Sequence, residues 1–535
     1  MIETTSTRRR AVALVVAVAA LVALSGCGLQ PDDPGAADVR FTIDAAPNAP
    51  RHPISPLVYG TNGDRSLATN KQGSVRMGGN RWTAWNWENN ASNAGSDWCF
   101  QNDGLLSSSN TPGEAVRADI AEAKAAGAAV VLTVPIVDYV AADKNGGCDV
   151  RNSGPNYLQT RFNQNKPTKG STLTLTPNAT DDFVYQDEYV NWVKTNQGDA
   201  NVVFSLDNEP DLWSSTHAEV HPNPVGYAEL VTRNTNFAKA IKGVWPTAKV
   251  AGPVNYGFYG FERLQGAPDA ANRNFLDFYL QQMKAADTAA GKRLIDYLDL
   301  HWYPEATGGG VRITGTDTSA AVVAARVQAP RSLWDPSYVE SSWISDPGQY
   351  NYGAIRLIPR TQDRINQFNP GTGLAFTEWN YGGGQHISGA VATADVLGIF
   401  GRESVGLANL WELNADESFT YAAFRAYRNF DGNGASFGDQ SIPATSSNVS
   451  KATVYASATT ADANKVTISA INKSTTATTA GITVACLATF TGARVYTITQ
   501  AGGANVVRQA DITTVGVNAY RYTMPPMSVS IIVPY

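Results

Sequence analysis

The segment VFSLDNEPDLW, residues 203–213, has the pattern of a buried strand that ends in reactive side chains. The apolar run over residues 202–206 suits a strand covered on both faces, and polar residues follow it at once. Glu209 is therefore expected just beyond the carboxyl end of a strand that Pro210 terminates. Trp213 would place an apolar surface beside that carboxyl group, and desolvation raises a carboxyl pKa. Taken alone, the segment fits a solvated Glu209 after an Asx turn equally well.

A second segment repeats this design. LAFTEWN, residues 374–380, is an apolar strand that carries Glu378 and the aromatic Trp379 at its end. In glycoside hydrolysis, one of two carboxyl groups protonates the leaving oxygen and the other attacks or assists at the anomeric carbon. Each segment alone is weak evidence, but together they predict a pair of carboxyl groups that face one cleft.

Strand-like segments alternate with helical ones along residues 57–435. Eight strands are predicted, at 57–62, 74–78, 130–134, 202–206, 250–254, 295–303, 374–380 and 407–411. Helices are predicted at about 114–126, 181–196, 225–244, 275–290, 354–367, 391–402 and 421–430, the second of them capped by Asp181 and Asp182. This order predicts a (β/α)8 barrel of the α/β class, in which chemistry collects at the carboxyl ends of the strands. The first two strands lack a convincing helix between them.

A second domain is predicted after the barrel. Residues 436–535 are rich in Ser, Thr, Ala and Val with period-two runs, which predicts an all-β sandwich. Residues 39–56 begin with the same alternation and are expected to add a strand to it, so that both ends of the chain meet in one sandwich. We expect this domain to pack against the barrel rather than to bind sugar separately.

The N-terminus has the features of an export signal. Three arginines precede an apolar run over residues 11–24 that is too short to span a bilayer comfortably. LSGC, residues 24–27, resembles the bacterial lipoprotein processing site, which predicts a signal peptide over residues 1–27, lipidation at Cys27 and an extracellular protein on the cell surface. An ordinary signal peptide that is cut nearby is the alternative. Residues 28–38 would form a flexible tether.

Composition and the remaining cysteines narrow the class of protein. A chain of 535 residues with a net charge of −6 and 16% charged residues is long enough for two domains and offers no basic patch for nucleic acid. An uncharged partner, a monomer and no required cofactor are expected, with membrane contact through the lipid alone. Cys99 and Cys148 lie in loop-like sequence and are disulfide candidates, whereas Cys486 is expected to be a buried thiol.

One long block of sequence points to a family. GNRWTAWNWENN at 79–90, with SDW at 96–98 and the two glutamate segments, resembles glycoside hydrolase family 44 from about residue 40 to the C-terminus. The resemblance implies a barrel with a β-sandwich and cleavage of β-1,4-glucans, including carboxymethylcellulose and xyloglucan, with retention of configuration. It implies Glu209 as acid/base and Glu378 as nucleophile, and we expect Asn208 to bind the sugar 2-hydroxyl.

Other side chains are candidates for supporting roles. His301 and Tyr303 occupy alternate positions at the end of the sixth strand and are expected to orient Glu378, with a core histidine as the alternative for His301. Trp411 is expected to form the floor of a sugar subsite. Further candidates for stacking on sugar, some of which we expect to be core, are Trp82, Trp85, Trp213 and Trp379. Candidate ligands for a structural calcium ion are Glu88, Asp97, Asp103 and Asp143, although they form no compact loop of oxygen ligands.

Two functions from different classes fit these features. The first is a secreted, retaining endo-β-1,4-glucanase of plant cell-wall degradation that acts on xyloglucan, carboxymethylcellulose or mixed-linkage glucan. The second is a non-catalytic, surface glycan-binding lipoprotein on a barrel scaffold. The two glutamates favour the enzyme, because a binding protein has no need of carboxyl groups at both strand ends. An exo-acting glycosidase stays open, since the sequence does not show whether loops close the cleft.

Overall fold

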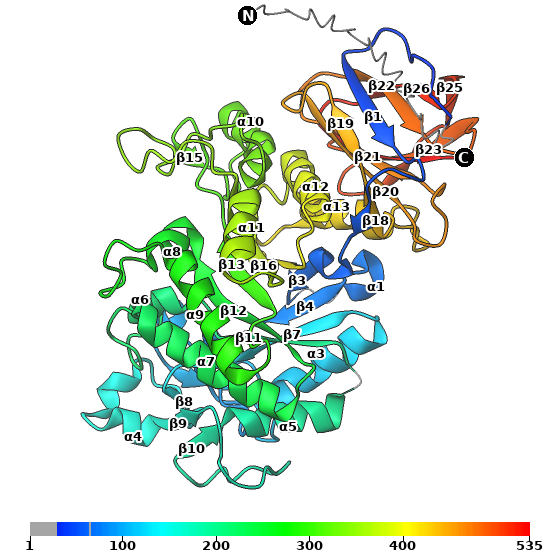
Figure 1. Cartoon of the computed structure of the whole chain (residues 1–535). Helices are drawn as coiled ribbons and strands as arrows, with labels where there is room; N and C mark the ends of the chain where they lie inside the picture. The colour runs from blue at the N-terminus through cyan, green and yellow to red at the C-terminus, as the bar shows by residue number, and fades with distance from the viewer. Residues whose placement is uncertain (1–28, 64–65, 199) are drawn as a thin grey trace, which may run out of the picture.

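Eight parallel strands close into a barrel in the computed structural model, which describes residues 29–63, 66–198 and 200–535 (Figure 1). The predicted signal peptide and Cys27 lie outside the described residues. The strands are β3 (Gly60–Asn62), β4 (Ser74–Met77), β7 (Ala129–Val134), β11 (Val202–Leu206), β12 (Lys249–Tyr256), β13 (Tyr297–Trp302), β16 (Gly373–Trp379) and β17 (Leu407–Leu410). Their order around the barrel is their order in the chain, which confirms the predicted (β/α)8 architecture.

Helices on the outside connect successive strands. The main ones are α3 (Glu114–Ala125), α5 (Gln186–Gln197), α7 (Tyr227–Val244), α9 (Phe275–Ala290), α11 (Leu357–Phe368) and α12 (Ile387–Arg402), and α13 (Ser418–Arg428) follows the last strand, β17. Between β3 and β4 lies the four-residue helix α1 (Leu67–Asn70), which is too short to produce a helical periodicity in the sequence.

Helix α5 begins later than the sequence indicates. Asp181 and Asp182 do not cap it, because the strand β10 (Phe183–Tyr185) comes first and pairs with β9 (Phe162–Lys166). The Asp181 carboxylate instead accepts a hydrogen bond from the Phe183 N–H at 3.0 Å. An acidic residue that caps a turn thus resembled a helix cap in the sequence.

The second domain is a curled sheet of twelve strands. It contains β1 (Val39–Asp44), β2 (His52–Pro53), β18 (Gln440–Ile442), β19 (Ala444–Ser446), β20 (Ala452–Ala458), β21 (Thr467–Asn472), β22 (Thr478–Ala485), β23 (Gly492–Thr499), β24 (Val507–Arg508), β25 (Ile512–Gly516), β26 (Ala519–Met524) and β27 (Ser528–Pro534). Strand β1 lies parallel to β22 and antiparallel to β19, so the N-terminal segment belongs to the same sheet as the C-terminal strands.

The segment predicted as a flexible tether lies against this sheet. Leu29 forms a β-bridge with Cys486. Asp32 exchanges two hydrogen bonds with Val517: its N–H donates to the carbonyl oxygen at 2.9 Å, and its Oδ2 accepts from the N–H at 2.8 Å. Within residues 29–38, hydrogen bonds at Leu29, Asp32 and Asp38 therefore connect the segment predicted as a tether to the sheet.

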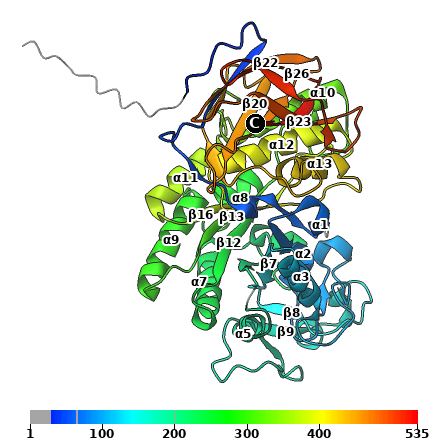
Figure 2. The ribbon, with the colours of Figure 1, turned by 90° about the vertical axis from the view of Figure 1, so that its right-hand side faces the viewer.

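Helix α12 lies at the interface between the two domains. Figure 2 shows α12 and α13 on the side of the barrel that the sandwich covers. Residues 387–401 of this helix are all buried, and most of them are apolar or small. Gly398 lets the Tyr455 ring of β20 approach, since a Cβ at position 398 would lie 2.2 Å from that ring. Asp395 and Lys473 form a fully buried ion pair of 2.6 Å across the interface.

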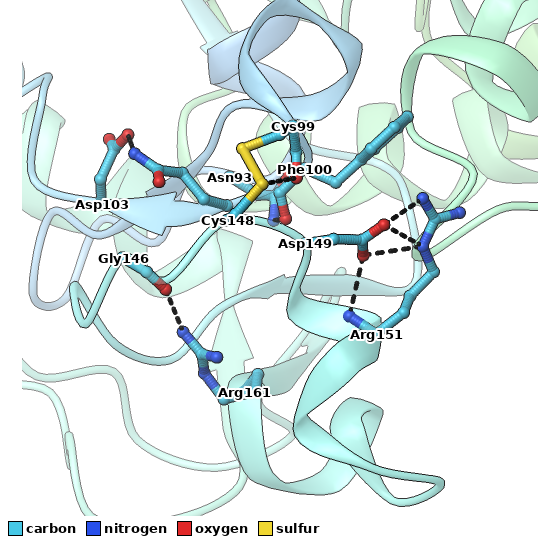
Figure 3. Close-up of a disulfide and its surroundings, with 10 residues drawn as sticks. Asn93, Cys99, Phe100, Asp103, Gly146, Cys148, Asp149, Arg151 and Arg161 are labelled. Carbon is cyan, nitrogen blue, oxygen red and sulfur yellow. Dashed lines mark hydrogen bonds and ion pairs between the residues drawn. A yellow bond between two sulfur atoms is a disulfide. The ribbon is translucent and has the colours of Figure 1, made fainter.

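The described cysteines lie where the sequence places them. Cys99 and Cys148 form a disulfide that joins the loop after Gly95–Trp98 to the loop before Val150–Ser153 (Figure 3). Cys486 is a buried free thiol in the sandwich. Among the described residues, no helix has the combination of length and hydropathy that crossing a bilayer requires.

Candidate active site

The two predicted glutamates lie in one cavity at the carboxyl ends of the barrel strands. Glu209 follows the end of β11, and Glu378 is the penultimate residue of β16. The cavity has a volume of about 320 Å³ and is also lined by Asn80, Asp97, Asn208, Tyr256, Tyr303, Arg312 and Trp411. The fold therefore brings together the two carboxyl groups that the strand-end pattern singled out.

The turn that carries Glu209 is held in an unusual backbone conformation. Asp207 and Glu209 have φ values of 71° and 43°, in the left-handed region that side chains other than glycine rarely adopt. The Glu209 N–H donates to the carbonyl oxygen of Val254 at 3.0 Å. The buried Asp207 carboxylate accepts from the Ile136 N–H at 2.6 Å and from Trp213 Nε1 at 3.3 Å. Such strain persists where the surroundings fix the backbone, and here it sets the direction of Glu209.

Glu378 is held from both sides. Arg76 Nη1 donates to Oε1 at 2.7 Å, and the Tyr303 hydroxyl donates to Oε2 at 2.8 Å. These two contacts hold the Glu378 side chain in one orientation at the end of β16. The prediction that Tyr303 orients Glu378 agrees with this contact.

Arg76 was not singled out in the sequence. Its side chain is fully buried on β4, and Nη2 donates to Asn208 Oδ1 at 2.8 Å. The signal was an arginine inside an apolar strand, because a charged residue is almost never fully buried unless it is paired.

His301 lies between the two carboxyl groups. Its Nδ1 is 2.8 Å from Glu209 Oε1 and 3.5 Å from Glu378 Oε2. The sequence predicted that it orients Glu378, but its hydrogen bond is to Glu209. Burial raises the pKa of Glu209 to about 7, against the opposing effect of Arg76, and burial lowers the pKa of His301 to about 4.

A chain of hydrogen bonds sets the tautomer of His301. The Thr377 hydroxyl donates to Asp299 Oδ2 at 2.8 Å, so its oxygen accepts from His301 Nε2, 3.1 Å away. Neutral His301 then carries its proton on Nε2 and offers Nδ1 as an acceptor. Protonated Glu209 can donate to that nitrogen, and the contact fixes the orientation of the carboxyl group.

Asn208 is held with its amide group in one orientation. Its Oδ1 accepts from Arg76 Nη2 and from the Gly79 N–H at 3.2 Å, and its Nδ2 donates to Asn80 Oδ1 at 3.3 Å; both asparagines line the cavity. Gly79 has a φ of 95°, and a Cβ there would lie 2.6 Å from the ring of Trp411. Trp411 is half-buried and lines the cavity, in keeping with its predicted place at a sugar subsite.

Four tryptophans that we expected to bind substrate lie in the core. Trp85, Trp213 and Trp379 have no exposed surface, and Trp82 is only 7% exposed. Trp379 packs between Phe400 and Phe424, for example. An enclosed indole has no free face for a sugar ring, so the prediction of sugar stacking is wrong for these residues.

The four acidic residues proposed as calcium ligands do not form a group. Asp103 pairs with Arg81 at 2.7 Å and Asp143 with Arg161 at 2.6 Å. Asp97 accepts from Asn80 at 2.8 Å, and Glu88 is buried, which raises its pKa to about 8. Within the described ranges, the group of His, Cys, Asp and Glu ligand atoms close enough to share an ion is Glu209, His301 and Glu378.

Comparison with known proteins identifies relatives of this chain. The model of glycoside hydrolase family 44 matches residues 91–306. Endoglucanase A of Paenibacillus lautus is 41% identical over 513 residues, which are 92% of this chain and 72% of that protein. A family 44 xyloglucanase of Paenibacillus polymyxa, solved with xyloglucan, superposes with a TM-score of 0.87 at 38% identity and covers 93% of this chain and 99% of its own.

A family 44 endoglucanase of Clostridium thermocellum gives a TM-score of 0.88 at 38% identity, over 94% of this chain and 100% of its own. These solved structures cover the barrel and the sandwich together. With the identity to the P. lautus enzyme over most of both chains, they show that this chain belongs to glycoside hydrolase family 44.

Proposed function

We propose that this chain is a retaining, endo-acting glycoside hydrolase that cleaves β-1,4-linked glucans. One observation carries the proposal: single oxygens of Glu209 and Glu378 and a ring nitrogen of His301 all lie within 4.8 Å of one another. In retaining enzymes the two carboxyl groups are about 5–5.5 Å apart, whereas inverting enzymes leave about 6.5–9.5 Å for a water molecule.

In the first step the two glutamates act together. Glu209, whose pKa is near 7, carries a proton below that pH and gives it to the glycosidic oxygen as the bond to the anomeric carbon breaks. Glu378, held by Arg76 and Tyr303, attacks the anomeric carbon from the opposite face and forms a glycosyl ester.

In the second step Glu209 acts as a base. It takes a proton from a water molecule, the oxygen of which attacks the anomeric carbon and releases Glu378 as a carboxylate. Two displacements at one carbon give net retention. His301 stays neutral, so it does not compete for the proton of Glu209 at the pH of the reaction.

The choice of glucan rests on the relatives and on the cavity. The relatives are named endoglucanases and a xyloglucanase, and the half-buried Trp411 beside Glu378 provides an apolar surface for a neutral sugar ring. We infer xyloglucan, carboxymethylcellulose and mixed-linkage glucan as the substrates to examine first. A non-catalytic binding protein is not favoured, since binding does not require one buried acid beside a second, paired carboxylate.

We also propose that the protein is exported, anchored at the cell surface through Cys27, and active as a monomer without a cofactor. The LSGC segment after an apolar run supports the export and the anchor. Labelling with a radioactive fatty acid in a lipoprotein-competent bacterium tests the anchor. Wild type should carry label, and Cys27→Ala should not; equal labelling of both would contradict it.

The function is tested by release of reducing ends and loss of viscosity on xyloglucan, carboxymethylcellulose, glucomannan and xylan. Wild type should thin at least one solution rapidly, and Glu209→Gln and Glu378→Gln should both fail to do so. Azide then separates the roles: with an activated aryl glycoside, Glu209→Ala should yield the β-glycosyl azide and Glu378→Ala the α-glycosyl azide. Binding to a glucan without any cleavage would support the binding protein instead.

A further inference from the structure

His217 is buried beside the active site and lies between two acceptors. It follows the short helix α6 (Trp213–Thr216), in the connection after β11 that also carries Glu209, and its side chain has no exposed surface. Its Nδ1 lies 2.8 Å from Glu219 Oε1, and its Nε2 lies 2.7 Å from the carbonyl oxygen of Asn80. Neither a carboxylate nor a carbonyl oxygen can donate a proton. Both contacts are therefore hydrogen bonds only if His217 is an imidazolium with a proton on each ring nitrogen.

The surroundings of His217 favour its charged form. Burial opposes a charge on the ring, but the carboxylates of Glu219 and Asp207 and the bond to the Asn80 carbonyl raise the pKa of His217 above its usual value. The Glu219 side chain has no exposed surface either, and a buried carboxylate is stable only beside a partner. His217 and Glu219 therefore form a buried ion pair, in which the second ring nitrogen is left to hold the backbone of Asn80.

Asn80 connects this ion pair to the catalytic cavity, which it lines together with Asp97 and Asn208. Its side chain bridges two groups: Nδ2 donates to Asp97 Oδ1 at 2.8 Å, and Oδ1 accepts from Asn208 Nδ2 at 3.3 Å. Asn80 is the first residue of the four-residue helix α2 (Asn80–Thr83), and so short a helix restrains its first residue weakly. The bond from the buried ring of His217 is therefore a main restraint on the position of Asn80.

We propose that His217 is a positioning residue of the active site. As a buried imidazolium it fixes Asn80, which in turn orients the amide group of Asn208. The inference rests on the proposed glucanase function, in which Asn208 binds the 2-hydroxyl of the reacting sugar. The NH₂ group of Asn208 has two hydrogens, so one bonds to Asn80 and the other is available to that hydroxyl. Because contacts to the 2-hydroxyl strengthen in the transition state, a loss of this support should lower kcat more than it raises KM.

The charge on His217 is measured by nuclear magnetic resonance. The chain has five histidines, so a protein made with ¹⁵N-labelled histidine gives few ring signals, and His217→Gln identifies the signals of this ring. We expect protons on both ring nitrogens of His217 in wild type at neutral pH. Glu219→Gln removes the carboxylate and keeps an acceptor, so the ring should lose a proton at lower pH than in wild type. A neutral His217 ring in wild type at neutral pH would overturn the proposal.

Kinetics test the positioning role, with His52→Gln as the matched control. His52 Nε2 also contacts a backbone carbonyl oxygen, that of Gly401 at 3.1 Å, but His52 belongs to the sandwich. On an activated aryl cellobioside, His217→Gln and Glu219→Gln should each lower kcat by about three- to tenfold and change KM little. On the analogue without the 2-hydroxyl that Asn208 binds, both variants should match wild type. His52→Gln should match wild type on both substrates.

The two substrates separate positioning from a purely structural role. A structural role would lower the melting temperature and reduce turnover of both substrates equally, which would overturn the proposal. Glu219→Gln keeps the histidine ring, so it provides the test even if His217→Gln fails to fold. Equal kcat of wild type and both variants on the aryl cellobioside would overturn the positioning role alone. Absence of wild-type turnover on the four polysaccharides would instead overturn the glucanase function, and the role of His217 with it.

Discussion

Arg76 Nη1 lies 2.7 Å from Glu378 Oε1, and the guanidinium is completely shielded from solvent. Its other nitrogen, Nη2, lies 2.8 Å from Asn208 Oδ1. One side chain of β4 therefore positions Asn208, in the turn after β11, and Glu378, on β16. Since removing one partner of a buried ion pair leaves a charge without compensation, the contact is expected to be important for both folding and catalysis.

Arg76→Met should lower kcat/KM on a soluble glucan by about 100-fold or more, because it removes a preorganised cation beside the attacking carboxylate. Arg76→Lys should give a smaller loss, since an ammonium keeps the charge but not the two-pronged contact. A Met variant with wild-type kinetics would contradict the role given to Arg76.

The raised pKa of Glu209 predicts the basic limb of the activity profile. Because the group is protonated below about pH 7 and ionised above it, kcat/KM should fall as pH rises through about 7. Glu209→Ala, assayed on an aryl glycoside whose leaving group needs no acid, should lack that limb. Persistence of the limb in this variant would assign it to another group.

The same shift predicts a pH-dependent effect on stability. Burial raises the pKa of Glu209 from 4.5 to about 7, so between these values the unfolded chain ionises while the folded chain does not, and stability falls as pH rises. Glu209→Gln removes this loss. The melting temperature of Glu209→Gln should exceed that of wild type by more at pH 8 than at pH 4. Between these pH values, the free energy of unfolding of the variant relative to wild type should increase by up to about 3 kcal/mol. An equal difference at both pH values would show that Glu209 ionises normally.

The buried pair of Asp395 and Lys473 should hold the two domains together. Asp395→Leu or Lys473→Met should each destabilise the protein by about 3–5 kcal/mol in chemical denaturation, because each leaves a buried group without its partner. The double variant Asp395→Leu with Lys473→Met should be closer to wild type than either single variant. Additive losses would mean that the pair acts through separate contacts.

The disulfide should stabilise the loops that border the cleft. It closes a loop of 49 residues, for which the loss of entropy in the unfolded chain is worth about 4 kcal/mol. A reductant should therefore lower the melting temperature of wild type and leave the double variant Cys99→Ser with Cys148→Ser unchanged. If wild type is equally insensitive, the bond does not contribute to stability.

The sequence revealed the strands of the barrel and both glutamates because their signal is local. An apolar run that changes to polar residues within one or two positions indicates the end of a buried strand without reference to the rest of the chain. The ion pair of Arg76 and Glu378 joins residues 302 positions apart, so no local pattern identifies it.

The tryptophans show a second limit. Trp85 and Trp98 both lie in the tryptophan-rich segment of residues 79–98, yet Trp85 has no exposed surface and Trp98 is 63% exposed. Composition shows that aromatic residues are concentrated there, but the three-dimensional packing decides which of them face solvent. His301 was predicted beside Glu378, from which its Nδ1 lies 3.5 Å away, but its shorter contact, of 2.8 Å, is with Glu209. Side-chain positions in space decide between the two glutamates.

The place of β1 in the sandwich has a consequence for biosynthesis. The N–H of Thr479 donates to Asp38 Oδ2, 441 residues earlier in the chain, and β1 pairs along its length with β22. During synthesis, β1 leaves the ribosome long before its two partner strands, β19 and β22. It therefore has no partner on either edge until more than four hundred further residues have been made. During that interval its free edges are open to pairing with other nascent chains, so the strand that completes the sandwich is also the segment whose exposure a chaperone would have to limit.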